Sequence, residues 1–126
     1  MPSHEQMVSA VERYVEAFEK SDPEMVVSLY APDATVEDPI GTPIHRGHDA
    51  IREFYTRSMT MGPKLELDGP VRTGGGYAAF PFSVVLDYGG QKKIEVIDTF
   101  KFDEEGKVTE MRAFWSPANM HGFEGQ

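Results

Sequence analysis

Residues 95 to 102 alternate in polarity with the two-residue period of a β-strand, in which successive side chains point to opposite faces of a sheet. One face carries Glu95, Ile97, Thr99 and Lys101, and the other carries Val96, Asp98, Phe100 and Phe102. The second face is apolar and must be covered by a core, yet it holds Asp98 with no Lys, Arg or His beside it. The fold must therefore bury this carboxyl group either with a distant partner or in its neutral form.

Asp98 has two physically different fates. It can form a buried ion pair with Arg72 or Arg112, which is a common outcome for an inward acid. Alternatively it stays protonated, because burial disfavours the charged form. A neutral carboxylic acid in a dry site is a strong hydrogen-bond donor, suited to stabilising negative charge that develops on an oxygen during a reaction. The sequence leaves both fates open.

A second acid, Asp38, directly precedes Pro39. Proline disfavours the helical conformation in the residue before it, so Asp38 is expected to begin an extended stretch after a short helix. An Asp-Pro pair usually marks a turn, which is the structural alternative to a catalytic role. An ionised Asp38 near a neutral Asp98 would give one site both a base and an acid.

Composition limits the function classes. We expect a single domain spanning residues 1–126, because no linker or repeat interrupts the 126-residue chain. The formal net charge of −9 argues against nucleic acid and anionic membranes as partners and favours a small apolar ligand. The chain has no cysteine, signal-peptide pattern or membrane-spanning apolar stretch, which suits the cytoplasm. Four scattered histidines and no nucleotide motif predict neither a metal nor another cofactor.

Three helices are expected in the first half of the chain. A capping box at Ser3, a proline at position 23 and a glycine at position 47 mark their starts. Their inward faces are expected to carry Met7, Ala10, Val11, Tyr14, Val15 and Phe18; Met25, Val26, Leu29 and Tyr30; and Ile51, Phe54, Tyr55 and Met59.

Strands are expected in the second half, as in an α+β domain whose helices cover one face of an antiparallel sheet. Phe80, Phe82, Val84 and Leu86 alternate along one strand, and residues 88–91 form a hairpin turn into the Asp98 strand. A turn at 103–107 leads to a last strand over 108–116, with Met111, Ala113 and Trp115 on one face. The tail from residue 119 to residue 126 is expected to be loose.

Tyr14, Tyr30 and Tyr55 all fall on inward helical faces of this pattern. Buried tyrosine hydroxyls need hydrogen-bond partners, and these three can supply one another. A linked chain of hydroxyls would make the terminal one a better donor. The structural alternative is three independent core tyrosines.

The chain resembles the bacterial steroid Δ5-isomerases (ketosteroid isomerases), within the wider nuclear transport factor 2-like, or SnoaL-like, superfamily. The matching stretches run in the order of that family and cover most of the chain. They are Glu12-Arg13-Tyr14, residues 30–39 (YAPDATVEDP), Phe54-Tyr55, Gly69-Pro70-Val71-Arg72, Pro81-Phe82, Val96-Ile97-Asp98, Phe102-Asp103 and Phe114-Trp115-Ser116.

The resemblance implies a cone-shaped fold of three helices on a strongly curved, mostly antiparallel sheet, and a homodimer formed through the outer sheet face. It implies that Asp38 is the general base that moves a proton from C4 to C6 of a 3-oxo-Δ5-steroid. It implies that Tyr14 and protonated Asp98 donate hydrogen bonds to the 3-oxygen, with Tyr30 and Tyr55 supporting Tyr14. The steroid would lie against Phe54, Phe82, Val84, Met111 and Trp115.

Two alternatives stay open. Polyketide cyclases of the same fold also pair an acidic base with an enolate-like intermediate. A non-catalytic module that binds a small ligand or a protein shares the fold but needs no pair of acids, so an ionised, salt-bridged Asp98 would favour it.

Overall fold

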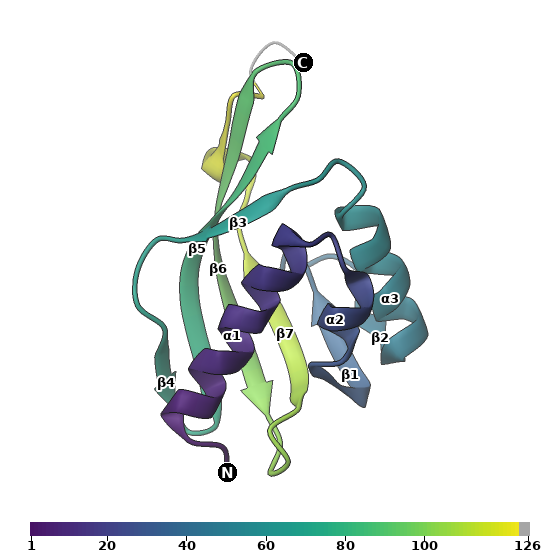
Figure 1. The fold of residues 1–126 in the computed structure, drawn as a ribbon, viewed down its shortest axis with the longest axis vertical. Coiled ribbons are helices and arrows are strands. Elements are labelled where there is room, and N and C mark those ends of the chain that lie inside the picture. Colours follow the sequence, from purple (N-terminus) through teal and green to yellow (C-terminus); the bar gives the residue numbers. More distant parts are fainter. Residues whose placement is uncertain (124–126) are drawn as a thin grey trace.

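A computed structural model describes residues 1–123 as three α-helices and a short 3-10 helix with one eight-stranded sheet. The helices lie on one side of the strongly bent sheet (Figure 1). Their bounds are α1 His4–Glu19, α2 Pro23–Val27, α3 Gly47–Ser58 and the 3-10 helix η1 Pro117–Asn119. This arrangement confirms the expected α+β cone. Within the described residues, no helix is long and apolar enough to cross a membrane.

The sheet has the strand order β2-β1-β7-β6-β5-β3, with β4 paired to β5 and β8 paired to β6. Only β1 and β7 are parallel among the described pairs. The strands are β1 Tyr30–Glu37, β2 His45–Arg46, β3 Lys64–Leu67, β4 Arg72–Gly74, β5 Tyr77–Asp87, β6 Gln91–Phe102, β7 Val108–Phe114 and β8 Met120–His121. β5 and β6 form a long hairpin that projects beyond the helices (Figure 1).

The predicted helix starts are confirmed. Ser3 and Gln6 make the reciprocal capping-box hydrogen bonds of α1, and the Asp22 side chain accepts from the backbone N–H of Met25 at the start of α2. The prediction that α2 carries Tyr30 is wrong, because the helix ends at Val27 and Tyr30 begins β1. Pro32 restricts Ala31 to extended backbone, and Tyr30 belongs to the same strand, where it is the Cα partner of Val108 in β7.

The alternation of residues 95–102 is confirmed as part of β6. Val96, Asp98, Phe100 and Phe102 are buried, whereas Glu95, Ile97 and Lys101 are exposed. Phe100 packs edge-on against Phe80 of β5 and against Tyr14 of α1, so the aromatic core joins the inner sheet face to the first helix.

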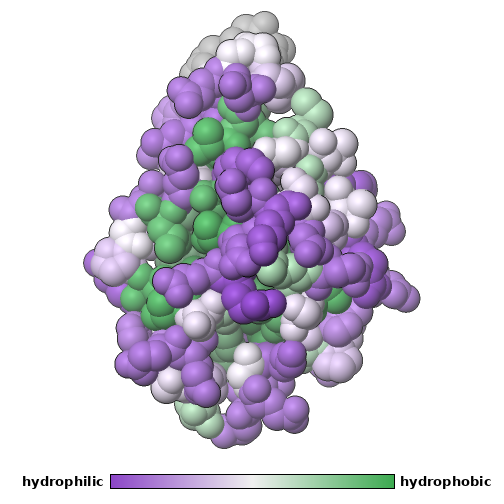
Figure 2. Space-filling view, viewed as in Figure 1, coloured by the Kyte–Doolittle hydropathy of each residue, from purple (hydrophilic) through white to green (hydrophobic). Residues whose placement is uncertain are grey.

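Apolar surface remains beside this core. Figure 2 shows it over β3 and the base of the β5–β6 hairpin, next to the hydrophilic outer surface of α1.

The end of the chain differs from the prediction. The last long strand stops at Phe114 rather than Ser116, and residues 117–121 form η1 and β8 instead of a loose tail. β8 pairs with β6 through the Cα partners Ile94–Met120 and Lys93–His121. The remaining part of the predicted tail, residues 124–126, lies outside the described residues.

Candidate active site

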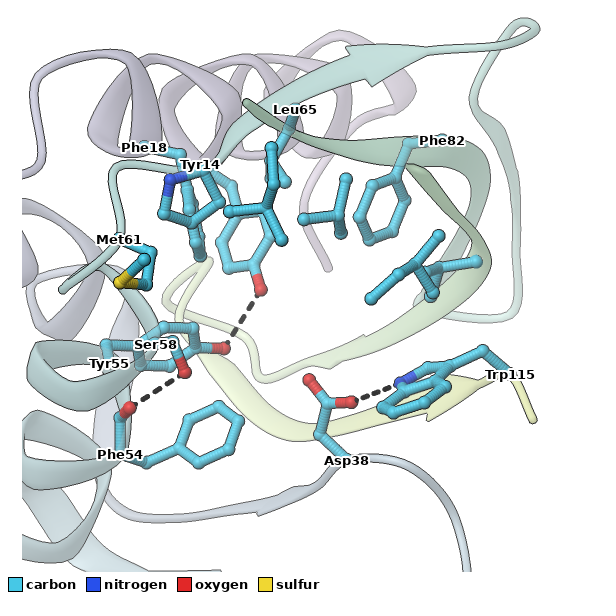
Figure 3. Close-up of a pocket in the computed structure, with 15 residues that line it drawn as sticks. Tyr14, Phe18, Asp38, Phe54, Tyr55, Ser58, Met61, Leu65, Phe82 and Trp115 are labelled. Atoms are coloured by element: carbon cyan, nitrogen blue, oxygen red, sulfur yellow. Dashed lines mark hydrogen bonds between the residues drawn. The ribbon is translucent and has the colours of Figure 1, made fainter. Parts of the chain in front are cut away.

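A cavity of about 310 Å³ lies between α1, α3 and the concave face of the sheet (Figure 3). Its size falls at the lower end of the range of small-molecule sites, and its wall is mostly apolar. The apolar lining consists of Phe18, Phe54, Met61, Pro63, Leu65, Phe82, Val84, Leu86, Ile94 and Val96. The polar lining consists of Tyr14, Asp38, Tyr55, Ser58 and Trp115.

Three buried tyrosines from three different elements form a linked chain of hydroxyl groups. The Tyr55 hydroxyl lies 2.7 Å from that of Tyr30 and 3.1 Å from that of Tyr14. When Tyr30 donates to Tyr55 and Tyr55 donates to Tyr14, the hydroxyl hydrogen of Tyr14 remains for the cavity. The prediction that these hydroxyls supply one another is confirmed.

The electrostatic environment keeps these hydroxyls neutral. Burial raises the pKa of Tyr14, Tyr30 and Tyr55 well above the usual tyrosine value. The nearby carboxyl of Asp98 raises the pKa of Tyr14 further, whereas the hydrogen bond from Tyr55 lowers it. Tyr14 is therefore a neutral donor whose acidity is increased by its neighbour.

Asp98 lies on the inner face of β6, where its relative exposure is 1%. It sits between Val96, which lines the cavity, and Phe100, which packs on the Tyr14 ring. Neither of its carboxyl oxygens has a hydrogen-bond partner among residues 1–123. Burial, followed by the charge of Asp38, raises its pKa well above the usual value for aspartate.

The predicted alternative of an Asp98–arginine pair is wrong. Arg112 stands opposite Thr99 on the other face of the sheet, and its guanidinium faces Glu110 and Glu37 at 3.4 and 3.9 Å. Arg72 is exposed in β4 and forms no salt bridge within the described part of the chain.

Asp38 lies at the cavity from the opposite side to Tyr14 (Figure 3). It follows directly on β1, so it ends an extended stretch rather than beginning one as predicted. One carboxylate oxygen, Oδ1, accepts a hydrogen bond of 2.8 Å from the indole Nε1–H of Trp115. Burial raises the pKa of Asp38, and the Trp115 hydrogen bond and the nearby His45 both oppose that rise.

The two carboxyl groups therefore occupy unlike environments. Asp38 has a hydrogen-bond donor and a neighbouring imidazole that favour its charged form, whereas Asp98 has neither among the described residues. Burial raises the pKa of both groups, but only for Asp38 do described partners oppose that rise. Such a pair can hold a base and a neutral acid in one site.

The structure brings most of the predicted pocket residues together. Phe54, Phe82, Val84 and Trp115 line the cavity, but Met111 does not, because it is fully buried in β7 between Phe100 and Val36 of the flanking strands. Sequence reasoning treated Trp115 only as an apolar wall and missed its bond to Asp38.

Sequence reasoning also missed His45, which lies outside the cavity wall, and Leu86 and Ile94 of the wall itself. His45 packs its ring on Phe54 with centroids 4.7 Å apart. It has no sequence signal of its own. The cavity residues Leu86 and Ile94 did carry a signal, since each continues the alternation of its strand.

Comparisons with known proteins agree with this geometry. The SnoaL-like domain family matches residues 11–111. A steroid Delta-isomerase from Nocardioides simplex is 45% identical over 113 residues, which cover 89% of this chain and 91% of that protein. The fold is also similar to a solved structure of the epoxide hydrolase/cyclase-like enzyme SalBIII, which is described for pyran ring formation in the polyether salinomycin. The TM-score is 0.88 at 25% sequence identity, and the match covers 95% of this chain and 98% of SalBIII. The chain therefore belongs to the SnoaL-like domain family and, within it, to the family of the steroid Delta-isomerases.

Proposed function

We propose that this protein is a steroid isomerase that moves the C5–C6 double bond of a 3-oxo-Δ5-steroid to C4–C5. The observation that carries the proposal is an apolar cavity with a carboxylate, Asp38, on one side and the hydroxyl of Tyr14 on the other. Near Tyr14 lies a buried acid, Asp98, that has no hydrogen-bond partner among residues 1–123. The 45% identity to a steroid Delta-isomerase supports the same activity.

In this mechanism Asp38 is the general base. Its carboxylate takes a proton from C4, and the electron pair of the C4–H bond forms a C3=C4 double bond as the carbonyl electrons move onto the 3-oxygen. The resulting dienolate collapses when the same carboxyl returns the proton to C6, which leaves the double bond at C4–C5. The reaction is an internal proton transfer with no net change of oxidation state, so this chemistry needs no cofactor. A positioned base contributes about 10²–10⁴-fold to such a rate.

Tyr14 and Asp98 would stabilise the dienolate oxygen. Both groups are neutral donors when protonated, and both stand in a water-poor environment where a hydrogen bond to a developing charge is strong. Neither carboxyl oxygen of Asp98 has a hydrogen-bond partner among residues 1–123, so the O–H of the neutral acid is available to donate to a ligand oxygen. One preorganised donor of this kind is typically worth roughly 3–4 kcal/mol.

A cyclisation or epoxide opening through the same acid–base pair is the second candidate. It is favoured by the structural similarity to the epoxide hydrolase/cyclase-like enzyme SalBIII. A purely ligand-binding role is less well supported, because it gives no reason for leaving Asp98 buried without an ion pair among residues 1–123.

Asp38→Asn is expected to lower the turnover of a Δ5-3-ketosteroid by about 10²–10⁴-fold, because the amide cannot accept the C4 proton. The ultraviolet absorbance of the conjugated product measures this directly, and steroid binding to the variant shows that the cavity is intact. Unchanged turnover would rule out Asp38 as the base. Absence of turnover in wild type that still binds the steroid would favour the second candidate.

Removal of either donor is expected to lower the turnover number rather than the affinity. Tyr14→Phe and Asp98→Ala should each lower kcat by about 10²–10³-fold, since each removes one donor from the dienolate oxygen. Asp98→Asn should be milder because an amide N–H still donates. Steady-state kinetics with thermal unfolding as a folding control tests this, and negligible effects of both removals would contradict the assignment.

Asp98→Asn is also expected to gain stability relative to wild type as the pH rises from about 4 to about 7. The unfolded acid ionises near pH ~3.9, whereas burial raises the pKa of the folded acid well above that value. Folding of the wild type must then take up a proton, so its stability falls as the pH rises through this window. Urea unfolding across the pH range measures the difference, with Asp87→Asn as an exposed control. A pH-independent difference would argue against a neutral Asp98.

We also propose that the protein forms a homodimer through the outer face of its sheet. Ile97 and Phe114 are Cα partners on β6 and β7 and are 49% and 41% exposed, which leaves apolar surface on the face that no helix covers. Ile97→Glu is expected to give a monomer in sedimentation measurements, and Ile44→Glu, at an exposed loop position, is expected to leave the dimer intact. A monomeric wild type would contradict this proposal.

A further inference from the structure

Trp115, whose indole N–H donates to Asp38, lies just beyond the end of β7. β7 ends at Phe114, so Trp115 has no place in the β6–β7 ladder. After it, the Ser116 backbone N–H donates to the Asn119 side chain at 2.9 Å, and the Asn119 N–H donates back to the Ser116 carbonyl at 2.8 Å. These bonds close η1, which leads at once into β8.

The segment after η1 is fixed to the β5–β6 hairpin. β8 pairs with β6 at Ile94, which itself lines the cavity. On the exposed side, the His121 imidazole contacts the Glu95 carboxylate at 2.7 Å. The chain therefore returns to the sheet within five residues of Trp115.

Lys92 of β6 makes a buried contact with this segment. Its relative exposure is only 2%, and its Nζ donates to the Gly122 carbonyl at 2.9 Å. The ammonium also lies 5.2 Å from the centre of the Tyr88 ring and 5.5 Å from that of Phe123. The carbonyl and the two aromatic faces stabilise a charge that burial removes from water, so they hold residues 122–123 against Lys92.

Gly122 is required by the path of the chain. Its φ is +86°, and a Cβ at this position would lie 2.4 Å from the backbone oxygen of Gln91. Any larger residue would push the segment away from β6. Residues Met120–Phe123 together with Lys92 are called the C-terminal latch below.

We propose that the C-terminal latch is a positioning element that holds the indole of Trp115 against the carboxylate of Asp38. Trp115 is fixed at one end by β7 and at the other by the latch, and the five residues between Trp115 and His121 contain only η1 and the start of β8. Release of the latch would let Trp115 move and would free the carboxylate that it orients. In this role Lys92 and Gly122 act through Trp115 and not on the ligand, and their catalytic effect rests on the function proposed for Asp38.

Two of the other groups that act on Asp38 are held by elements outside the latch, and the third, Asp98, lies on β6 six residues along the strand from Lys92. His45 faces it from β2, Asp98 from β6 and Tyr14 from α1. None of these three contacts the latch through a hydrogen bond or ion pair described here. A change at Lys92 or Gly122 is therefore expected to reach Asp38 through Trp115.

Tryptophan fluorescence tests the proposal without turnover, because Trp115 is the single tryptophan of the chain. The emission of wild type is expected to change as Asp38 ionises, and Asp38→Asn should remove that change. The Trp115 hydrogen bond lowers the pKa of Asp38. Lys92→Met and Gly122→Ala should therefore move the pH midpoint of this fluorescence change to a higher value. They should also shift the Trp115 emission to longer wavelength, because the released indole meets more water. Gly122→Ala displaces the latch but keeps the charge of Lys92. It therefore distinguishes the effect of moving the latch from the effect of removing that charge.

Lys93→Met is the matched control. It removes the same charge from the next residue, whose exposed side chain lies on the other face of β6. This variant should keep the wild-type emission and midpoint. Wild-type emission and midpoint in both latch variants would overturn the proposal, and so would an equal shift in Lys93→Met.

Turnover gives the second readout. Lys92→Met is expected to lower kcat for a Δ5-3-ketosteroid by about five- to tenfold, the scale of one net hydrogen bond. The same change in a Trp115→Phe background should add little further loss, whereas fully additive losses would show that the latch acts elsewhere. If the wild type has no isomerase activity, the proposed function fails while the fluorescence result still decides the latch.

Discussion

The burial of one carboxyl group, that of Asp98, determines the character of the site. The inner face of β6 places it between Val96 and Phe100, where no described residue offers a hydrogen bond. Water is displaced there by the aromatic packing of Tyr14, Phe80 and Phe100. Because a lone charge is very costly in such surroundings, the fold favours the neutral acid and leaves it with an unused capacity to donate a hydrogen bond. The same dry environment strengthens any hydrogen bond that a ligand oxygen makes with it.

Burial also removes the hydroxyls of Tyr14, Tyr30 and Tyr55 from water, but these groups have hydrogen-bond partners in the protein. Each hydroxyl is buried, but each finds a partner on another element, so α1, α3 and β1 are joined at one point. The chain ends at Tyr14, whose hydrogen is left for the cavity when the donors run from Tyr30 through Tyr55. The tyrosine chain therefore reaches the cavity wall at Tyr14, whereas Asp98 lies behind the wall, between Val96, which lines the cavity, and Phe100.

Local sequence rules predict those features of the structure that are set by residues close together in the chain. The alternation of β6, the capping box at Ser3 and the turns around the last three long strands follow from period, caps and turn residues. Tyr30 was misassigned because helical spacing continues beyond the end of α2 at Val27, and the pairing of Tyr30 with Val108 of β7 leaves no mark in the local pattern. The Trp115–Asp38 bond joins positions 77 residues apart, and nothing in either local pattern records it.

The difference between the two acids shows why the end of the chain matters to the chemistry. Both carboxyl groups are drawn towards the neutral form by burial, and only Asp38 has counteracting partners, in Trp115 and His45. In the proposed mechanism Asp38 must be ionised when its substrate arrives, and the Trp115 hydrogen bond and His45 both favour that form. That bond depends on the placement of a residue outside the main ladder. The pairing of β8 with β6 and the buried Lys92 contact therefore extend the physical requirements of the site well beyond the cavity wall.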